Sequence, residues 1–225
     1  MAGQVVNEQH FYDIANAIRS KNGESTLYRP QDMGPAILDI QLDDLTLKQI
    51  FAQTLVDFNN DEITAVRQFM MSHNGTNSTL LTVNLPNMVS IGYRAFYWCT
   101  ALTTVNLPEV VTIEEGAFSS CRSISSITLN KVETIGQEAF YGCSSLTSVT
   151  LPCVTSIGVN GFRSCSNLTS FILSGSTVCT LGGAALNDTP IASGTGYIYV
   201  PSNLVDTYKA ANNWSIYASQ IRAIS

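Results

Sequence analysis

The chain has 225 residues, of which 45% are hydrophobic and only 12% are charged, a composition that provides a continuous apolar core and excludes a disordered chain. Its formal net charge is −6 at pH 7 and its 11 Lys and Arg residues are not clustered, so we expect no binding to nucleic acid. No apolar run approaches the roughly 20 residues of a membrane span, and the first residues lack the layout of a signal peptide, so we expect synthesis in the cytoplasm.

Residues 1–40 are predicted to be helical. The stretch "NEQHFYDIANAIRSKNG" predicts a helix that Asn7 caps and Gly23 ends, and a second short helix is predicted from Pro30. The motifs "AIRSKNG" and "YRPQDMGPAI" resemble N-terminal segments of tail and other minor structural proteins encoded by phages and prophages of Firmicutes. That resemblance implies an attachment role for this segment. The alternative is a helical hairpin that shields the first coil of the repeat that follows.

Residues 41–78 are interpreted as a linker followed by a degenerate first copy of that repeat. In "DEITAVRQFMMSHNGTNSTL", Ile63, Val66 and either Phe69 or Met70 stand at positions that are apolar in the later copies. Terminal coils of a repeat protein differ from internal ones because one of their sides meets water.

Residues 79–190 repeat with a period of 22 residues, and apolar residues of one kind recur at the same place in each copy. A period of this size is typical of a solenoid, in which each coil buries its apolar face only against its neighbours. The recurring columns are Val83, Val105, Ile127, Val149 and Phe171; Leu85, Leu107, Leu129, Leu151 and Leu173; Ile91, Ile113, Ile135 and Ile157; Phe96, Phe118, Phe140 and Phe162; and Cys99, Cys121, Cys143 and Cys165.

Each copy predicts two short strands and a compact turn. Val105 and Leu107 stand two apart, which is strand spacing, and Pro108 ends that strand because it cannot donate to a ladder. A second strand, "VVTI" or "VETI", follows and is often closed by a glycine turn, as at Gly136 and Gly158. The next turn directs one Phe inward. Strands of successive coils would then pair in parallel at about 4.8 Å.

The pattern Leu-x-x-Val-x-Leu-Pro-x-x-Val-x-x-Ile-Gly-x-x-Ala-Phe-x-x-Cys is similar to the leucine-rich repeats of the BspA type. The resemblance implies a β-rich parallel solenoid of 22-residue coils, covering residues 79–190, with a binding or structural role. The fifth copy departs from the pattern, because it carries two extra residues before Leu181 and has Leu186 in place of Phe.

Residues 191–225 are predicted to form an α/β cap, a strand followed by a helix, over the last coil. Ser202 is the expected N-cap of the helix, and Trp214, Tyr217 and Ile221 are the expected plugs of the core. This segment also resembles the closing segment common in BspA-type proteins.

Little in the sequence indicates catalysis. The cysteine column has neither zinc-site spacing nor an accompanying histidine, so we expect buried thiols that fill space, with Cys153 more exposed and unpaired. His10 and His73 lack triad partners, and adjacent acids such as Glu114 and Glu115 would point to opposite faces of a strand. We therefore expect no enzyme, no cofactor and no metal site.

Two surfaces could contact a partner. The outward columns of the first strand carry small polar residues, whose alternative role is solubility and cross-coil hydrogen bonding: Thr82, Thr104, Ser126, Ser148 and Ser170, and Asn84, Asn106, Thr128 and Thr150. The turns around Phe carry aromatic and arginine side chains, which are common anchors of interfaces and also stack on sugars. Their alternative role is that of ordinary exposed turns. These candidate partner-binding residues are Tyr93, Arg94, Tyr97, Trp98, Tyr141 and Arg163.

The sequence thus predicts a non-catalytic binding or structural protein. With the N-terminal resemblance and the missing signal peptide, we expect a phage or prophage tail component located in the virion, which presents the solenoid to a host surface or to neighbouring tail proteins. The alternative is a bacterial cell-surface or secreted adhesin module that binds host proteins or glycans. Both interpretations imply a protein or glycan partner, and the residues leave a homo-oligomer open.

Overall fold

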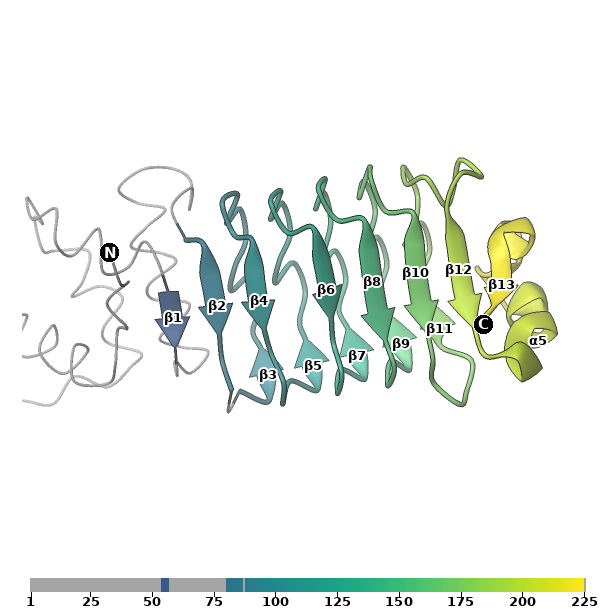
Figure 1. The fold of residues 1–225 in the computed structure, drawn as a ribbon, viewed down its shortest axis with the longest axis horizontal. Coiled ribbons are helices and arrows are strands. Elements are labelled where there is room, and N and C mark those ends of the chain that lie inside the picture. Colours follow the sequence, from purple (N-terminus) through teal and green to yellow (C-terminus); the bar gives the residue numbers. More distant parts are fainter. Residues whose placement is uncertain (1–53, 57–79, 87, 225) are drawn as a thin grey trace, which may run out of the picture.

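The computed structural model of the chain describes residues 54–56, 80–86 and 88–224, which form a rod of stacked coils (Figure 1). Each coil has a front strand, a rear strand and a turn that leads to the next coil. The front strands are β1 (Thr54–Val56), β2 (Thr82–Asn84), β4 (Thr104–Asn106), β6 (Ser126–Thr128), β8 (Ser148–Leu151) and β10 (Ser170–Leu173). The rear strands are β3 (Ser90–Ile91), β5 (Thr112–Ile113), β7 (Thr134–Ile135), β9 (Ser156–Ile157) and β11 (Thr180–Leu181).

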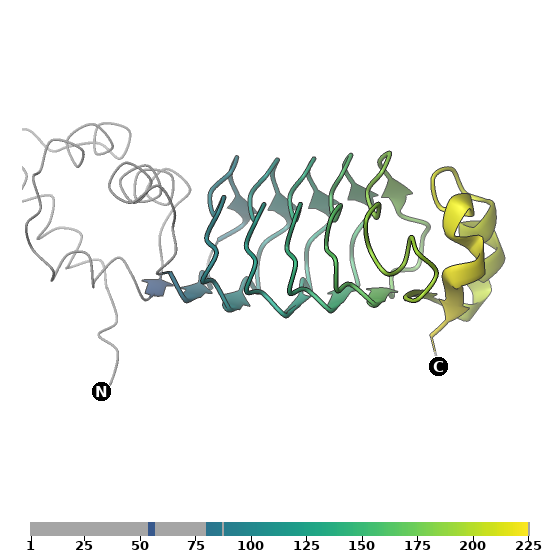
Figure 2. The same ribbon diagram turned by 90° about the horizontal axis from the view of Figure 1, so that it is seen from above.

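The strands pair in parallel with their own copies in neighbouring coils, except that β4 does not pair with β6. Thr82 faces Thr104 in the front sheet, and Ile113 faces Ile135 in the rear sheet. Figure 2 shows the front and rear strands on opposite sides of the rod, with the core between them. The structure therefore confirms the β-rich parallel solenoid.

The phenylalanine column forms a stack along the core. Phe96, Phe118, Phe140 and Phe162 are each at most 1% exposed. Successive ring centroids lie 5.1, 5.3 and 5.0 Å apart, and the interplanar angles are 15°, 7° and 5°. The prediction that this residue points inward is confirmed. The isoleucine and leucine columns are buried beside it.

The parallel ring stack ends where the last copy departs from the pattern, and the next ring contact is edge-on. Leu186 occupies the phenylalanine position and is fully buried, and Phe171 occupies the position that holds Val or Ile in earlier copies. The Phe171 ring meets the Phe162 ring edge-on at 5.1 Å, and it lies 6.5 Å from the ring of Trp214. Phe171 thus connects the aromatic stack of the solenoid with Trp214 of the C-terminal segment.

The turns around phenylalanine form a third ladder between coils. The backbone N–H groups of Arg94, Phe96 and Trp98 donate to carbonyl oxygens of the next coil at 2.9, 2.7 and 2.8 Å. Two positions of each turn have a left-handed backbone, two residues before and two residues after the buried side chain. These positions hold Arg94, Gly116, Glu138, Asn160 and Ala184, and Trp98, Ser120, Gly142, Ser164 and Asp188.

The front sheet is interrupted between β4 and β6. The strands order as β1-β2-β4 in one sheet and β13-β12-β10-β8-β6 in another, whereas the rear sheet runs unbroken from β3 to β11. Val105 is only half-buried at this point, although Val83 and Val149 of the same column are fully buried. The expectation that Val105 is a core residue like its copies is therefore wrong in degree, because β4 pairs with β2 on one side but not with β6 on the other.

The glycines that follow the rear strands serve close packing and not a special turn conformation. Gly136 and Gly158 are absent from the positions with a left-handed backbone. A Cβ atom on Gly158 would lie 2.5 Å from the backbone nitrogen of Gln137 in the preceding coil. Glycine is therefore required there because adjacent coils approach closely, and the carbonyl of Gly158 also accepts from the N–H of Gly161 at 3.1 Å, so the predicted turn does begin at this glycine.

The C-terminal segment continues the front sheet and then covers its end. Strand β12 (Tyr197–Val200) pairs with β10, and β13 (Ile221–Ala223) pairs with β12. Between them lie η1 (Ser202–Leu204), α5 (Val205–Ala210) and η2 (Ser215–Gln220). Ser202 does not cap the helix as predicted, because α5 begins after Leu204, which makes no side-chain capping bond. The final strand β13 was also not predicted.

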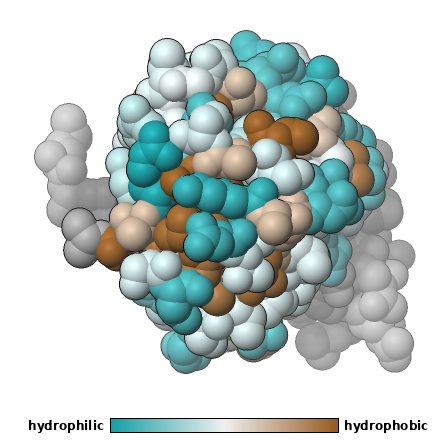
Figure 3. Space-filling model, turned by 90° about the vertical axis from the view of Figure 1, so that its right-hand side faces the viewer, coloured by the Kyte–Doolittle hydropathy of each residue, from teal (hydrophilic) through white to brown (hydrophobic). Residues whose placement is uncertain are grey.

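Side chains of this cap take the place of a further coil. The backbone N–H of Cys179 donates to the Tyr208 hydroxyl at 3.0 Å, and its carbonyl accepts from Trp214 Nε1 at 2.7 Å. Asn213 Nδ2 donates to the carbonyl of Leu181, also at 2.7 Å. Trp214, Tyr217 and Ile221 are buried as predicted. The capped end consequently presents scattered rather than continuous hydrophobic residues (Figure 3).

The predictions for residues 1–40, and for the core positions Ile63, Val66, Phe69 and Met70, lie outside the described residues. Strand β1 pairs with β2 and so adds a strand to the front sheet ahead of the first well-matched copy. None of the helices in the described part of the chain has the length and apolar character needed to cross a bilayer.

Replacing Phe118 with Ala should lower the free energy of unfolding by about 3–5 kcal/mol, because it leaves a cavity inside the stack. Chemical denaturation followed by circular dichroism measures the loss. Val89→Ala is the matched control, since Val89 is 62% exposed. A loss below about 1 kcal/mol at Phe118 would contradict its role in the core.

Replacing Tyr208 with Phe should cost about 1–3 kcal/mol, because it removes only the hydroxyl that satisfies the buried N–H of Cys179. The same change at Tyr197, which is 39% exposed, should be close to neutral. Thermal unfolding of the two variants compares the effects, and equal stability would show that the cap does not satisfy the backbone of the last coil.

Candidate functional site

Four of the six predicted partner-binding residues lie together on the turn of the first well-defined coil. The guanidinium carbon of Arg94 lies 5.1 Å from the ring centroid of Tyr93 and 5.2 Å from that of Tyr97. The Tyr97 and Trp98 rings lie 6.2 Å apart with a tilt of 38°. Arg94 is therefore held between two tyrosine rings, and the indole extends the same group.

Arg122 completes the group and was missed from the sequence. Its guanidinium carbon lies 5.4 Å from the ring centroid of Trp98. Arg122 directly follows Cys121, so it enters from the next coil and is remote from Trp98 in sequence. The 22-residue period could have indicated this contact. It places the residue after Cys121 near the residue before Cys99, which is the cysteine of the previous coil. We call Tyr93, Arg94, Tyr97, Trp98 and Arg122 the turn cluster.

The backbone holds the turn cluster in a strained shape. Arg94 has a φ of 51° and Trp98 a φ of 61°, both in the left-handed region. Other copies place Gly116 and Ser120 at these positions. A bulky residue there costs about 1–2 kcal/mol, and such strain concentrates at functional sites.

The second coil is shaped to accept Arg94. A Cβ atom on Gly116 would lie 2.9 Å from Cγ of Arg94, so the arginine stem rests on the bare backbone of this glycine. Gly116 also has a φ of 64°. Its lack of a side chain therefore serves two needs at once, the left-handed turn and the seat for the arginine.

The arginines of the turn cluster have no acidic partner among the described residues. The ion pairs in that part of the chain are Lys131 with Glu109 at 2.5 Å and Arg163 with Asp188 at 3.1 Å. Neither Arg94 nor Arg122 joins an ion pair or a side-chain hydrogen bond to any described residue. Each guanidinium carbon lies over an aromatic ring, and no described residue accepts from its N–H groups.

Tyr141 and Arg163, the other two predicted residues, lie on the same edge in later coils. Both occupy the column that contains Tyr97, directly after the buried phenylalanine. Among the described residues neither has a ring contact with the turn cluster, and Arg163 is occupied by its ion pair with Asp188. The structure therefore does not bring these two residues into the group.

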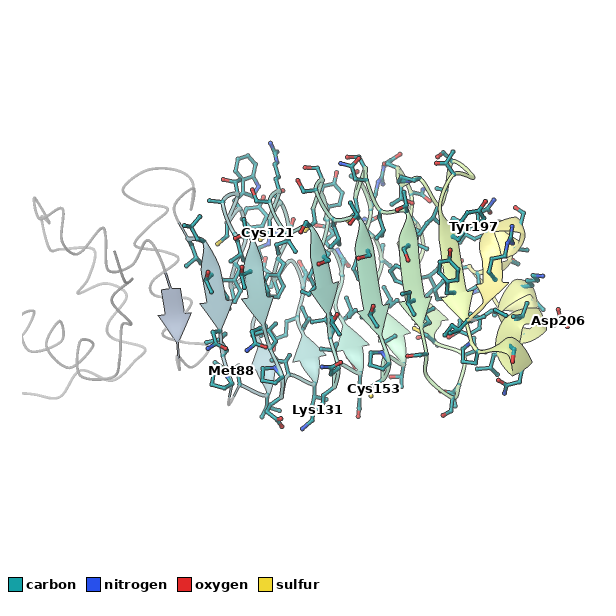
Figure 4. The ribbon with its side chains drawn as sticks, in the orientation of Figure 1. Met88, Cys121, Lys131, Cys153, Tyr197 and Asp206 are labelled. Atoms are coloured by element: carbon teal, nitrogen blue, oxygen red, sulfur yellow. The ribbon has the colours of Figure 1, made fainter. Side chains whose placement is uncertain are left out.

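A second aromatic surface lies at the other end of the rod and was not predicted. Tyr197, labelled in Figure 4, lies 6.4 Å from Tyr199, and the Arg222 guanidinium stacks 4.9 Å from the Tyr197 ring. The Nη1 atom of Arg222 donates to the carbonyls of Ser219 and Ile221 at 2.7 and 3.0 Å. This arginine is already satisfied by backbone, unlike those of the turn cluster.

The small polar columns of the front sheet form hydrogen bonds between coils. Asn106 Nδ2 donates to Asn84 Oδ1 at 2.7 Å, one coil away. A neighbouring column does the same with hydroxyls, because Thr147 Oγ1 donates to the carbonyl of Ser125 at 2.9 Å. These contacts agree with the structural alternative for this face.

The cysteine column consists of buried thiols and not of disulfides, as predicted. Cys121 Sγ donates to the carbonyl of Phe96 at 3.1 Å, and Cys143 and Cys165 make the same bond one coil further on. Burial raises the pKa of the Cys121 and Cys143 thiols well above the ordinary value. Burial therefore makes these two thiols poor nucleophiles. Within the described residues, no three His, Cys, Asp or Glu side chains converge as metal ligands.

Cys179 is also buried, and burial raises its pKa to about 12, whereas Cys153 is exposed. Figure 4 shows Cys153 beside Lys131 on the lower edge of the rod and Cys121 in the upper half. Iodoacetamide at mildly alkaline pH should modify one thiol of the native chain and all six after unfolding, counted by mass. Cys153→Ser should abolish the native reaction. Modification of a second native thiol would show that the column is accessible.

Solved structures share this architecture only in part. A leucine-rich cell surface protein from Faecalibacterium prausnitzii is 23% identical over 56% of this chain and 35% of that chain, with a TM-score of 0.42. A leucine-rich repeat protein from T. pallidum is 24% identical over 57% of this chain and 66% of that chain, with a TM-score of 0.36. The chain thus spans less than two thirds of either. The search of curated proteins found no match.

The repeat itself matches a known family over more than half of the chain. Residues 73–208 match the BspA type leucine-rich repeat region in 6 copies. The match covers the coils with stacked Phe, Ile and Leu columns and extends into α5. The chain therefore belongs to the family of BspA-type leucine-rich repeat proteins.

Proposed function

We propose that this protein is a non-catalytic binding module that contacts its partner through the turn cluster. The observation that carries the proposal is the pair of guanidinium groups, on Arg94 and Arg122, that are packed on aromatic faces and have no acidic partner among the described residues. Aromatic and arginine side chains dominate the energetics of recognition surfaces.

The repeat makes this choice of residues informative. The core columns keep one kind of side chain from coil to coil, whereas the turn positions are free to vary. At the two left-handed positions most copies carry small or short side chains, and the first coil carries Arg94 and Trp98. Arg94 and Trp98 are unfavourable at left-handed positions and lie on the surface turn, which supports a role for them in binding and not in folding.

Two settings follow from different parts of the chain. The resemblance of residues 1–40 to minor structural proteins of phages supports a tail component that presents the solenoid to a host surface or to neighbouring virion subunits. Membership of the BspA-type family supports the second setting, a bacterial cell-surface adhesin module that binds host proteins or glycans. Antibody detection on purified virions and on intact cells separates the two.

Exchanging Tyr97 and Trp98 for Ser, the residue that the second coil carries at both positions, should abolish binding and leave the melting temperature nearly unchanged. The second coil shows that this turn accepts Ser at the left-handed position, and the lost contact with Arg122 is worth only about 0.5–1 kcal/mol at an exposed site. Flow cytometry with the labelled protein on bacterial cells, and sedimentation with purified virions, measure binding.

The matched control is Tyr141→Ser, because Tyr141 occupies the Tyr97 column but has no ring contact with an arginine among the described residues. This control should bind like the unmodified chain. Undiminished binding by the double variant would remove the turn cluster as the recognition surface.

A further inference from the structure

Resting on this proposed function, we infer that the ligand of the turn cluster is an acidic polysaccharide whose sugar rings carry carboxylate groups. The inference combines three features of the site: the free edges of its arginines, its position across two coils, and the absence of a usable backbone edge. Each feature restricts the chemistry of the partner.

The free edges of the guanidinium groups select an acid. A guanidinium carries five N–H donors that lie in its plane, so stacking on a ring leaves the donors at its edge available. Arg94 is stacked between Tyr93 and Tyr97, which fixes its plane, and Arg122 is stacked on Trp98. A planar carboxylate pairs with such an edge through two parallel hydrogen bonds. Lysine could not reproduce that geometry.

The positions of the two arginines select a ligand with repeated charges. Arg94 and Arg122 come from consecutive coils and lie 5.2 and 5.4 Å from the centroids of the Tyr97 and Trp98 rings, which are themselves 6.2 Å apart. A polymer with an acid on successive units can engage both at once. Binding to the second site is then intramolecular, which raises the apparent affinity.

The backbone and the rings favour a sugar over a peptide. An extended peptide gains affinity by adding to a free strand edge, but the N–H groups of Arg94, Phe96 and Trp98 already donate to the next coil. What the turn offers is ring surface, with Tyr93 51% exposed. The C–H faces of a pyranose ring pack against aromatic faces while its carboxylate meets an arginine. An acidic peptide lacks the first of these contacts.

Local charge allows this ligand in spite of the acidic chain. The formal net charge is −6 at pH 7, so a polyanion is repelled at long range. At physiological ionic strength that repulsion is screened beyond about 8 Å, whereas contacts with the arginine edges act within it. Glu115 on the adjoining coil gives Arg94 its backbone carbonyl and makes no ion pair with it.

Titration calorimetry with oligogalacturonate, its methyl ester and poly-L-glutamate tests the inference. The ester is the same sugar without the charge, and poly-L-glutamate has the charge without the sugar. Only oligogalacturonate should bind, and added salt should weaken it. Arg122→Met and Arg94→Lys should each weaken binding about tenfold, the loss of one charge-assisted contact. Arg163→Met, which removes an arginine already paired with Asp188, should bind like the unmodified chain.

The outcomes separate the two proposals. No binding of oligogalacturonate, or equal binding of the ester or of poly-L-glutamate, overturns the acidic polysaccharide and leaves the binding surface in place. Equal loss of affinity in Arg163→Met overturns the claim that unpaired arginines select the ligand. Failure of the Tyr97 and Trp98 exchange to reduce binding to cells or virions removes the surface itself.

Discussion

Parallel stacking at one coil step is the constraint on which the rest of this structure depends, because it places each side chain directly against its own copy. Only residues that pack favourably on themselves can recur in a column. Phenylalanine rings stack nearly parallel, asparagine amides bond to one another, and the thiols of Cys121, Cys143 and Cys165 each donate to a carbonyl of the preceding coil. Equal charges repel when they stand opposite each other in a sheet. The low charged fraction of 12% agrees with this constraint, and Glu109 and Lys131, which face each other one coil apart, have opposite signs.

Much of the fold could be predicted from the period alone, since the columns define what is buried and what pairs. The departures have local physical causes. Val105 is half-buried although the residues on either side of it are the same as those around Val83, because its exposure depends on whether β4 and β6 pair. The exchange between Phe171 and Leu186 is visible only once the cap is in place. The helical segments η1 and α5 of the cap have no side-chain N-cap. The prediction that Ser202 caps the helix therefore failed.

The sequence predicted the kinds of residue in the turn cluster, but it did not predict correctly which residues belong to it. The aromatic and arginine residues of the first coil stand out because later copies carry only single ones at these positions, such as Tyr141 and Arg163. Arg122 was missed because contacts across coils are remote in sequence, and Arg163 was included because its partner Asp188 could not be foreseen. The left-handed backbone was hidden as well, since only Gly116 and Gly142 reveal it among ten residues of mixed type. The residue types indicated an aromatic and arginine surface. Only the structure showed which arginines lack an acidic partner among the described residues.

The interruption of the front sheet has a mechanical consequence for this site. The coil that contains Arg94 and Trp98 leads into β4, and the coil that contains Arg122 leads into β6, so the turn cluster bridges the two halves of the rod at the point where one wall is open. The rear strands and the turns remain joined there and form a flexural joint along one side. A ligand that binds both arginines would hold these two coils together at the joint. Binding at the turn cluster would then increase the bending stiffness of the rod.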